Sequence, residues 1–326
     1  MIQYSVDFAA LTEEIKKRGY ERVLLQLPEG LTVQATEFAE QLSEFEVYIS
    51  STPTYGACDI EVYPDMLTVH IGHSPIPNIK YPDNIIFVEA FSDASFTAVA
   101  ELFASFNDCE NVGIVASVQH IKKIQDVKNI LESHGKKVMI GRGDSRITYP
   151  GQVLGCNFSA AREVADEVDC FAFLGTGVFH ALGVRVSTGK STFILDPYSG
   201  TTTDVESDAD RFVRQRFGAI VKAQEAETFG IIVGAKIGQR RRALARAMKN
   251  MIEDAGKKAY LIYSDITSPE RFYYAVDVFV NTSCPRIAYD DYLRFPKPVL
   301  TPIELQIALK YKLWENFRFD EIVEVD

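Results

Sequence analysis

Three cysteines have the residue type and the placement to build a chemically active site. Each stands in a loop that follows a predicted strand, and these cysteines are Cys58, Cys156 and Cys284. Three thiolates can hold a 4Fe–4S cluster and leave its fourth iron open to a substrate. Gly56 and Gly155, beside two of the cysteines, permit close backbone approach. The alternative is three ordinary buried or loop cysteines, which spacing alone does not exclude.

The other two cysteines have structural explanations. Cys170 lies within a predicted central strand, where we expect it to be a small core hydrophobe. Cys109 lies in a predicted turn, where we expect a surface thiol or a partly buried filler. An odd, sparse set of five cysteines argues against a disulfide framework.

Histidines occupy similar loops. His70 is inside a predicted strand, so we expect a core histidine with its hydrogen bonds satisfied. His73 follows Gly72 after that strand, where it is either a contact of the site or a structural hydrogen-bond partner. His180 is expected in the corresponding loop of the next repeat.

The elements that must position these residues recur three times along the chain. Short strands, apolar on both faces, alternate with helices, as in parallel sheets covered by helices. The repeats are residues 1–107 with Cys58, residues 108–226 with Cys156 and residues 227–326 with Cys284. We expect an α/β fold of three homologous small domains, each a roughly four-stranded parallel sheet flanked by helices, in a pseudo-threefold arrangement around a central site. Right-handed crossovers then place the functional loops at the carboxyl ends of the strands.

The repetition is most detailed at one strand of each repeat. Segments 65–72, 169–176 and 277–284 align without gaps, and each begins with an aspartate. This match indicates that the three strands occupy equivalent places in three related sheets.

Composition limits the classes of function. The 326 residues carry a net charge of −11, which argues against broad nucleic-acid binding because that needs a basic face. The local cluster of Arg240, Arg241, Arg242 and Arg246 is interpreted as a solvated helix face. No signal peptide and no apolar run of roughly 18 residues is visible, so we expect a cytoplasmic protein with no membrane segment.

Short motifs spread over nearly the whole chain form a pattern typical of one family. They are segments 25–31, 55–59, 70–74, 151–156, 179–180, 196–197, 236–239, 284–288 and 300–302, of which Tyr55-Gly-Ala-Cys58 and Cys284-Pro-Arg286 are the sharpest. In these residues the chain resembles the diphthamide-synthesis family of noncanonical radical S-adenosylmethionine enzymes, whose archaeal members are 2-(3-amino-3-carboxypropyl)histidine synthases. One departure is Pro75, where the family is expected to carry a cysteine. The set of three cysteines remains intact.

The resemblance implies an activity and its cofactors. A 4Fe–4S cluster would be bound by Cys58, Cys156 and Cys284, and the 3-amino-3-carboxypropyl group of S-adenosylmethionine would be transferred to imidazole C2 of a histidine in translation elongation factor 2. Methylthioadenosine would be the second product. The enzyme would be a homodimer served by a low-potential electron donor, with no membrane and no direct nucleic-acid contact. For S-adenosylmethionine, we expect contacts from Gly72, His73, Gly234, Lys236, Gln239 and Arg286.

Two other interpretations stay open. A dehydratase similar to quinolinate synthase would also use three cysteines and an open iron, as a Lewis acid, without S-adenosylmethionine. A non-enzymatic member would be a partner subunit that passes electrons or a binding protein with a structural metal. Formation of methylthioadenosine separates the transferase from the dehydratase, and cysteine variants with full activity would favour the partner subunit.

Overall fold

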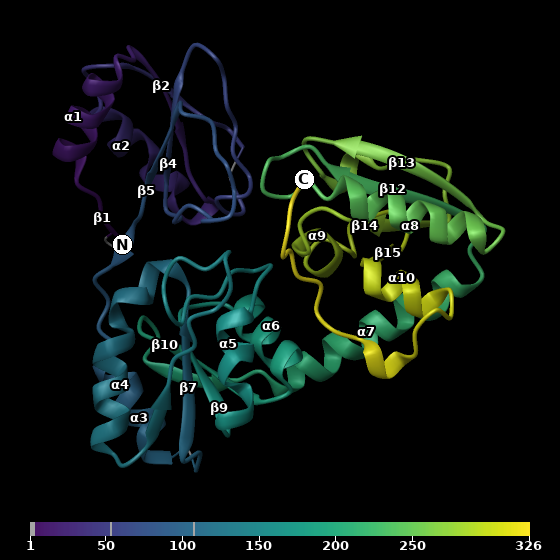
Figure 1. Cartoon of the computed structure of the whole chain (residues 1–326). Helices are drawn as coiled ribbons and strands as arrows, with labels where there is room; N and C mark the ends of the chain where they lie inside the picture. The colour runs from purple at the N-terminus through teal and green to yellow at the C-terminus, as the bar shows by residue number, and fades with distance from the viewer. Residues whose placement is uncertain (1–3, 53, 107) are drawn as a thin grey trace. The chain divides into compact units, whose positions relative to one another are not determined.

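The computed structural model describes residues 4–52, 54–106 and 108–326. Its chain divides into two compact units. Unit 1 comprises Met1–Val153, Ser159–Thr176 and Phe193–Thr203, and unit 2 comprises Leu154–Phe158, Gly177–Thr192 and Asp204–Asp326. Each unit is described separately below (Figure 1).

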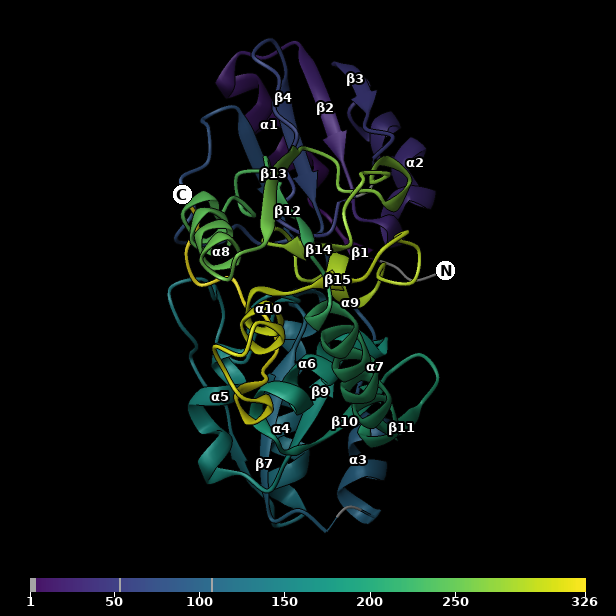
Figure 2. The same cartoon turned by 90° about the vertical axis from the view of Figure 1, so that its right-hand side faces the viewer.

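Unit 1 contains a four-stranded parallel sheet in the order β3-β2-β4-β5. Figure 2 shows β4, β2 and β3 in a row. The strands are β2 (Arg22–Gln26), β3 (Glu46–Ile49), β4 (Leu67–Ile71) and β5 (Ile85–Val88), and the helices are α1 (Phe8–Arg18), the 3-10 helix η1 (Glu29–Gln34) and α2 (Ala35–Gln41). All of β4 is buried, including Thr68 and His70, which alternate with its apolar residues. Asp7 caps the start of α1 by accepting a hydrogen bond from the Ala10 amide at 3.0 Å.

A second sheet has the order β11-β10-β9-β7-β8. Its strands are β7 (Asn111–Ala116), β8 (Lys137–Met139), β9 (Cys170–Leu174), β10 (Ser191–Asp196) and β11 (Thr201–Asp204). Its helical segments are α3 (Thr97–Phe106), η2 (Val118–Lys123), α4 (Ile124–Ser133), α5 (Ser159–Val164) and η3 (Ala165–Glu167). Figure 1 shows α3 and α4 on one side of β7 and α5 on the other. The short strands β1 (Tyr4–Ser5) and β6 (Phe91–Ser92) pair antiparallel.

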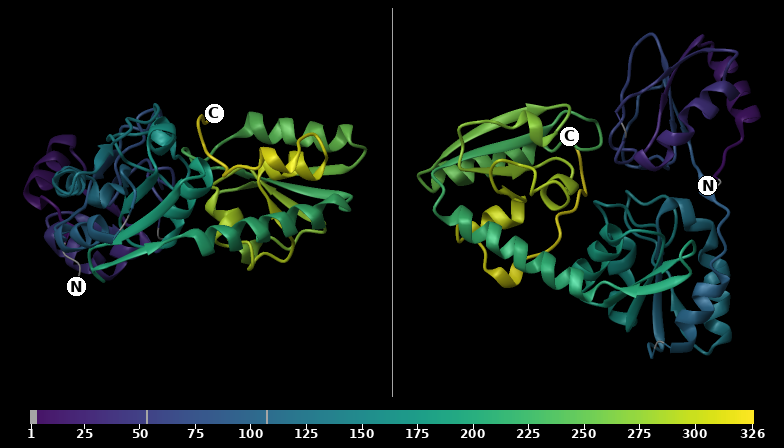
Figure 3. Two further views of the ribbon diagram at one scale, coloured as in Figure 1. Left: turned by 90° about the horizontal axis from the view of Figure 1, so that it is seen from below. Right: turned by 180° about the vertical axis from the view of Figure 1, so that it is seen from behind.

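Unit 2 contains the third sheet, in the order β13-β12-β14-β15. Its strands are β12 (Thr228–Gly234), β13 (Lys258–Ser264), β14 (Val278–Asn281) and β15 (Val299–Leu300). Its helical segments are α6 (Val178–Thr188), α7 (Glu206–Gln224), α8 (Arg242–Asp254), η4 (Pro269–Arg271), α9 (Arg286–Tyr289), α10 (Pro302–Ala308) and η5 (Trp314–Asn316). Apolar residues of α7, α8 and α10 form one core with β12 and β14. Figure 3 shows α7 as a long, unbroken helix in both views.

The repeated aspartates perform the same task in two sheets. Asp169, before β9, accepts hydrogen bonds from the Glu110 and Asn111 amides at 3.1 and 2.8 Å, which fixes the start of β7. Asp277, before β14, accepts the equivalent bonds at the start of β12. Asp65 instead pairs with Arg22 at the start of β2 at 3.2 Å. The three strands therefore do occupy equivalent places in their sheets.

The α/β class with three mainly parallel sheets is confirmed, whereas the three domain limits and the pseudo-threefold arrangement stay predictions. One local prediction is wrong, since His180 lies within α6 and not in a loop. In the described residues, no helix is long and apolar enough to cross a membrane.

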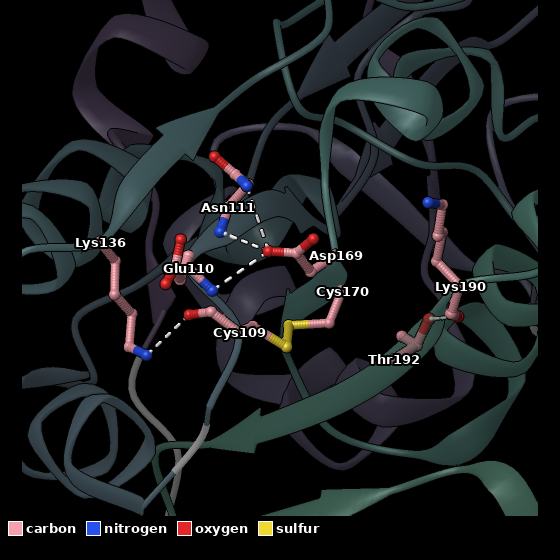
Figure 4. Close-up of a disulfide and its surroundings, with 8 residues drawn as sticks. All are labelled: Cys109, Glu110, Asn111, Lys136, Asp169, Cys170, Lys190 and Thr192. Carbon is pink, nitrogen blue, oxygen red and sulfur yellow. Dashed lines mark hydrogen bonds between the residues drawn. A yellow bond between two sulfur atoms is a disulfide. The ribbon is translucent and has the colours of Figure 1, made fainter.

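The interpretation of Cys109 and Cys170 as separate thiols is also wrong. They form a disulfide whose Cα atoms are 6.2 Å apart (Figure 4). Cys109 lies two residues before β7 and Cys170 begins the neighbouring strand β9, so the parallel register of the strands brings the two together. Cys170 is fully buried, as predicted, but its sulfur is used as a cross-link.

Candidate metal and substrate site

Cys58 lies in the loop between β3 and β4, and its side chain is buried. The loop is held at the carboxyl end of β2, because the Thr54 amide donates to the Leu27 carbonyl at 3.0 Å. The Tyr81 hydroxyl donates to the Ala57 carbonyl at 3.0 Å, and the Asp59 amide donates to the Gly56 carbonyl at 2.9 Å. The Cys58 thiol therefore sits in a defined loop at the sheet edge where parallel α/β sheets bind ligands.

A chain of hydrogen bonds connects this loop to two histidines. Gln26, buried at the end of β2, donates from Nε2 to the Asp59 carbonyl at 3.2 Å and accepts from the Glu61 amide at 3.4 Å. These backbone partners fix the orientation of the Gln26 amide, so its oxygen accepts from Nδ1 of His70 at 3.3 Å. Nε2 of His70 lies 3.0 Å from Nδ1 of His73.

The protonation of both histidines follows from their surroundings. Burial holds the pKa of His70 well below its ordinary value, with a further contribution from His73, and burial lowers the pKa of His73 to about 4. Both rings are therefore neutral at pH 7. Since His70 donates from Nδ1, its Nε2 accepts, and His73 must donate from Nδ1. His73 then has an unprotonated Nε2, which is a hydrogen-bond acceptor.

Gly72 has a geometric role next to this chain. Its φ is 111°, a conformation that favours glycine, and a Cβ there would lie 3.0 Å from Cγ of Pro28. Its carbonyl accepts a hydrogen bond from Gln119 at 2.8 Å. This tight turn sets the path of the chain into His73.

Cys156 and Cys284 both belong to unit 2, are buried, and share a cationic neighbour, Arg241. Burial alone would lower the pKa of Arg241. The interactions with Asp320 and with the two cysteines are larger in sum, so the pKa of Arg241 is raised. Arg241 pairs with Asp320 at 2.7 Å and donates to the carbonyls of Thr282 and Ser283 at 2.9 Å each. One guanidinium thus anchors the loop that carries Cys284.

The C-terminal segment anchors Cys156 in the same unit. The Ile322 amide donates to the Cys156 carbonyl at 2.8 Å, and the Phe158 amide donates to the Glu321 carboxylate at 2.7 Å. Asp320, the partner of Arg241, is in the same segment. The loops of Cys156 and Cys284 are therefore tied to one ion pair. The prediction of a solvated face was wrong for Arg241, which precedes α8 and is 5% exposed.

The remaining predicted contacts also lie in unit 2. Gly234 ends β12 and packs so closely that a Cβ would lie 2.5 Å from Oγ of Ser283. Gln239 is buried and accepts a hydrogen bond from the same hydroxyl at 2.9 Å. Lys236 lies in the loop between them, and its backbone carbonyl accepts from the Gln239 amide. The loop from Gly234 to Gln239 and Ser283 therefore form one packed region.

Arg286 begins α9, just after Cys284. Its guanidinium pairs with Asp290 at 2.7 Å and lies 5.0 Å from the ring centroid of Phe179. Phe179 in turn packs against Gly155, next to Cys156, where a Cβ would lie 2.8 Å from the ring. Arg286 and Phe179 thus connect the segments that carry the two cysteines.

Two buried arginines received no functional role from the sequence. Arg146, in the loop after β8, is 1% exposed, and its three guanidinium nitrogens have no hydrogen-bond partner among the described residues. Arg241 was likewise assigned no role. No local sequence signal marks either residue, because the burial of Arg146 and the pairing of Arg241 with Asp320 depend on the folded chain.

The cysteines are divided between the units: Cys58 belongs to unit 1, and Cys156 and Cys284 belong to unit 2. Within the described part of the chain, no group of three or more His, Cys, Asp or Glu side chains is placed to hold a metal ion. The ligand set therefore rests on the donors themselves. Three buried thiols suit iron–sulfur chemistry, and the cation beside two of them favours negative charge there.

The fold has three mainly parallel sheets, and buried cysteines lie in loops between their strands and helices. These features define the class of protein: an α/β protein whose thiols are the donors typical of iron–sulfur proteins. The family model described as putative diphthamide synthesis protein matches residues 27–318. The chain belongs to this diphthamide synthesis family.

Curated relatives and a solved structure agree with this assignment. The 2-(3-amino-3-carboxypropyl)histidine synthase of Pyrococcus horikoshii is 37% identical over 98% of this chain and 94% of its own length. The protein of that name from Methanocaldococcus jannaschii is 28% identical over 94% of this chain and 88% of its own. A crystal structure of Dph2 from Pyrococcus horikoshii with a 4Fe-4S cluster has a TM-score of 0.87 at 34% identity, covering 100% of this chain and 96% of that one.

Proposed function

We propose that this chain is a 2-(3-amino-3-carboxypropyl)histidine synthase that holds a 4Fe–4S cluster through Cys58, Cys156 and Cys284. It transfers the 3-amino-3-carboxypropyl group of S-adenosylmethionine to imidazole C2 of a histidine in translation elongation factor 2 and releases methylthioadenosine. The observation that carries the proposal is the set of three buried thiols, in a chain that matches a Dph2 structure with a 4Fe-4S cluster over its whole length.

The chemistry explains why three thiols suit the task. A three-thiolate cluster supplies one electron and an open iron position when it is bound. Imidazole C2 is a poor nucleophile, so transfer by a radical avoids a slow polar attack. Arg241 favours the thiolate forms of Cys156 and Cys284 and holds the backbone of the Cys284 loop.

Other residues are assigned to binding. We assign Gly72, His73, Gly234, Lys236, Gln239 and Arg286 to the S-adenosylmethionine site. His73 brings an acceptor nitrogen that matches the donor N–H groups of the substrate ammonium. Gly72 and Gly234 permit the tight turns and packing that shape their loops. The guanidinium of Arg286 pairs with Asp290, so part of its charge is already compensated.

The wider setting belongs to the same proposal. We assign domains to residues 1–107, 108–226 and 227–326, one cysteine to each, in a pseudo-threefold arrangement. The enzyme acts in the cytoplasm as a homodimer and receives electrons from a low-potential donor. It contacts no nucleic acid directly.

The test is an anaerobic assay with dithionite, S-adenosylmethionine and elongation factor 2. We expect methylthioadenosine in the solution and a matching mass increase on one histidine of the factor. Single Cys→Ala changes at Cys58, Cys156 and Cys284 should abolish both signals, whereas the double change Cys109→Ala/Cys170→Ala should retain them at a temperature where it is folded. A wild-type protein with its cluster that forms neither product refutes the proposal.

A further inference from the structure

Arg146 is a buried arginine whose guanidinium has no hydrogen-bond partner among the described residues. It belongs to unit 1, it is 1% exposed, and Nε and both terminal nitrogens have no hydrogen-bond partner among those residues. A guanidinium stays charged at any physiological pH. A buried, unpaired charge is strongly unfavourable, so a native protein keeps one mainly where a ligand supplies the opposite charge.

Three acidic side chains that bond to this loop accept hydrogen bonds from groups other than the Arg146 guanidinium. Asp144, two residues before Arg146, accepts from the backbone amide of Arg146 at 2.9 Å, not from its side chain. Glu163 accepts from the amides of Arg142 and Gly143 at 2.6 and 2.9 Å. Glu89 accepts both of its hydrogen bonds from the Tyr149 hydroxyl.

These bonds make the loop a firm support for Arg146. The Ile147 amide donates to the Asp144 carbonyl at 3.0 Å, and the Asp144 amide donates to Oγ of Ser159 at 2.9 Å. Oε1 of Gln152 accepts from the amides of Thr148 and Tyr149 at 3.1 Å each. The backbone on both sides of Arg146 is therefore fixed, which limits the positions open to its side chain.

The chemistry of the partner follows from the donor. A guanidinium presents parallel N–H groups that match the two oxygens of a carboxylate. This step rests on the proposed function: S-adenosylmethionine carries a sulfonium and an ammonium, and its only anionic group is the carboxylate of its amino-acid part. We propose that Arg146 binds this carboxylate and so selects S-adenosylmethionine. Methylthioadenosine lacks the carboxylate, since that group leaves with the transferred fragment, so Arg146 does not retain this product.

The test compares the binding of two ligands to variants of the cluster-loaded, anaerobic protein. We expect Arg146→Met to weaken the affinity for S-adenosylmethionine by about 10- to 100-fold, because charge-assisted hydrogen bonds are lost. The affinity of Arg146→Met for methylthioadenosine should change less than about twofold. The affinity of Arg146→Lys for S-adenosylmethionine should lie between those of the wild type and Arg146→Met. Arg142→Met, an exposed arginine of the same loop, is the matched control and should bind both ligands like the wild type.

Stability in the absence of ligand distinguishes a binding role from a structural one. Removing an unpaired buried charge should leave the melting temperature of Arg146→Met equal to or above that of the wild type. Unchanged affinity for S-adenosylmethionine, or an equal loss for both ligands with a lower melting temperature, refutes the role of Arg146. A wild-type protein with its cluster that binds no S-adenosylmethionine refutes the proposed function itself.

Discussion

Arg241→Met is the substitution that most directly probes how the protein holds Cys156 and Cys284. The change removes the ion pair with Asp320 and the bonds to the carbonyls of Thr282 and Ser283. Removing one partner of a buried ion pair costs about 3–5 kcal/mol. Because the Asp320 side chain is 10% exposed, we expect the lower end, about 3 kcal/mol.

The chain offers a matched control at the next position. Arg242 pairs with Asp326 at 3.4 Å, and its side chain is 54% exposed. An exposed pair of this kind contributes about 0–1 kcal/mol, so Arg242→Met should be nearly neutral. Because both substitutions replace arginine by methionine at the start of one helix, their difference isolates burial and pairing.

The single tryptophan is a fluorescent probe in unit 2, the unit that contains Arg241. Trp314 lies in unit 2, stacked on Phe317 with ring centroids 4.8 Å apart, so its fluorescence reports unfolding of that unit. In urea titrations, Arg241→Met should lose about 3 kcal/mol and Arg242→Met less than about 1 kcal/mol. Arg241→Met should also bind less iron after reconstitution. Equal stabilities for the two variants, with full iron content in both, would refute this account of Arg241.

Three further predictions concern groups that the structure defines. Thiol titration of the denatured protein should find three thiols before reduction and five after it, and five before reduction would exclude the disulfide. Loss of the Cys109–Cys170 disulfide should lower the free energy of unfolding by about 4 kcal/mol, because it closes a loop with a sequence separation of 61. The pKa of His73 is about 4 in the folded state and about 6.5 in the unfolded state, so the unfolded state binds more protons between pH 4 and 6.5. The free energy of unfolding should therefore fall as the pH falls from 6.5 to 4. This loss should be smaller in His73→Gln. Gly234→Ala should lower the melting temperature, because the alanine Cβ would lie 2.5 Å from Oγ of Ser283. An unchanged melting temperature would contradict the close packing of Gly234 against Ser283.

The elements of the fold were largely predictable because their signals are local. Apolar residues at alternate positions from Leu67 to Ile71 predict a strand. The apolar spacing between Glu206 and Gln224 predicts a long helix. The equivalence of the strands after Asp169 and Asp277 was also visible, because each aspartate bonds to the start of a neighbouring strand.

Long-range pairings were not predictable in the same way. The Cys109–Cys170 disulfide depends on the register of two strands that are far apart in the sequence. Arg241 appears in the sequence as one of several clustered arginines, and only the fold brings Asp320 to it. Arg146 has no distinguishing neighbour in the sequence, since its distinguishing property is a buried guanidinium with no hydrogen-bond partner among the described residues.

Iron and sulfide analysis with EPR spectroscopy tests the central claim most directly. The measurement uses anaerobically prepared wild-type protein, the triple variant Cys58→Ala/Cys156→Ala/Cys284→Ala and the variant Cys109→Ala/Cys170→Ala. We expect about four iron and four sulfide per chain and a dithionite-induced signal in the wild type and the double variant, and neither in the triple variant. Iron that persists in the triple variant, or a reconstituted wild-type protein without iron, would contradict the account.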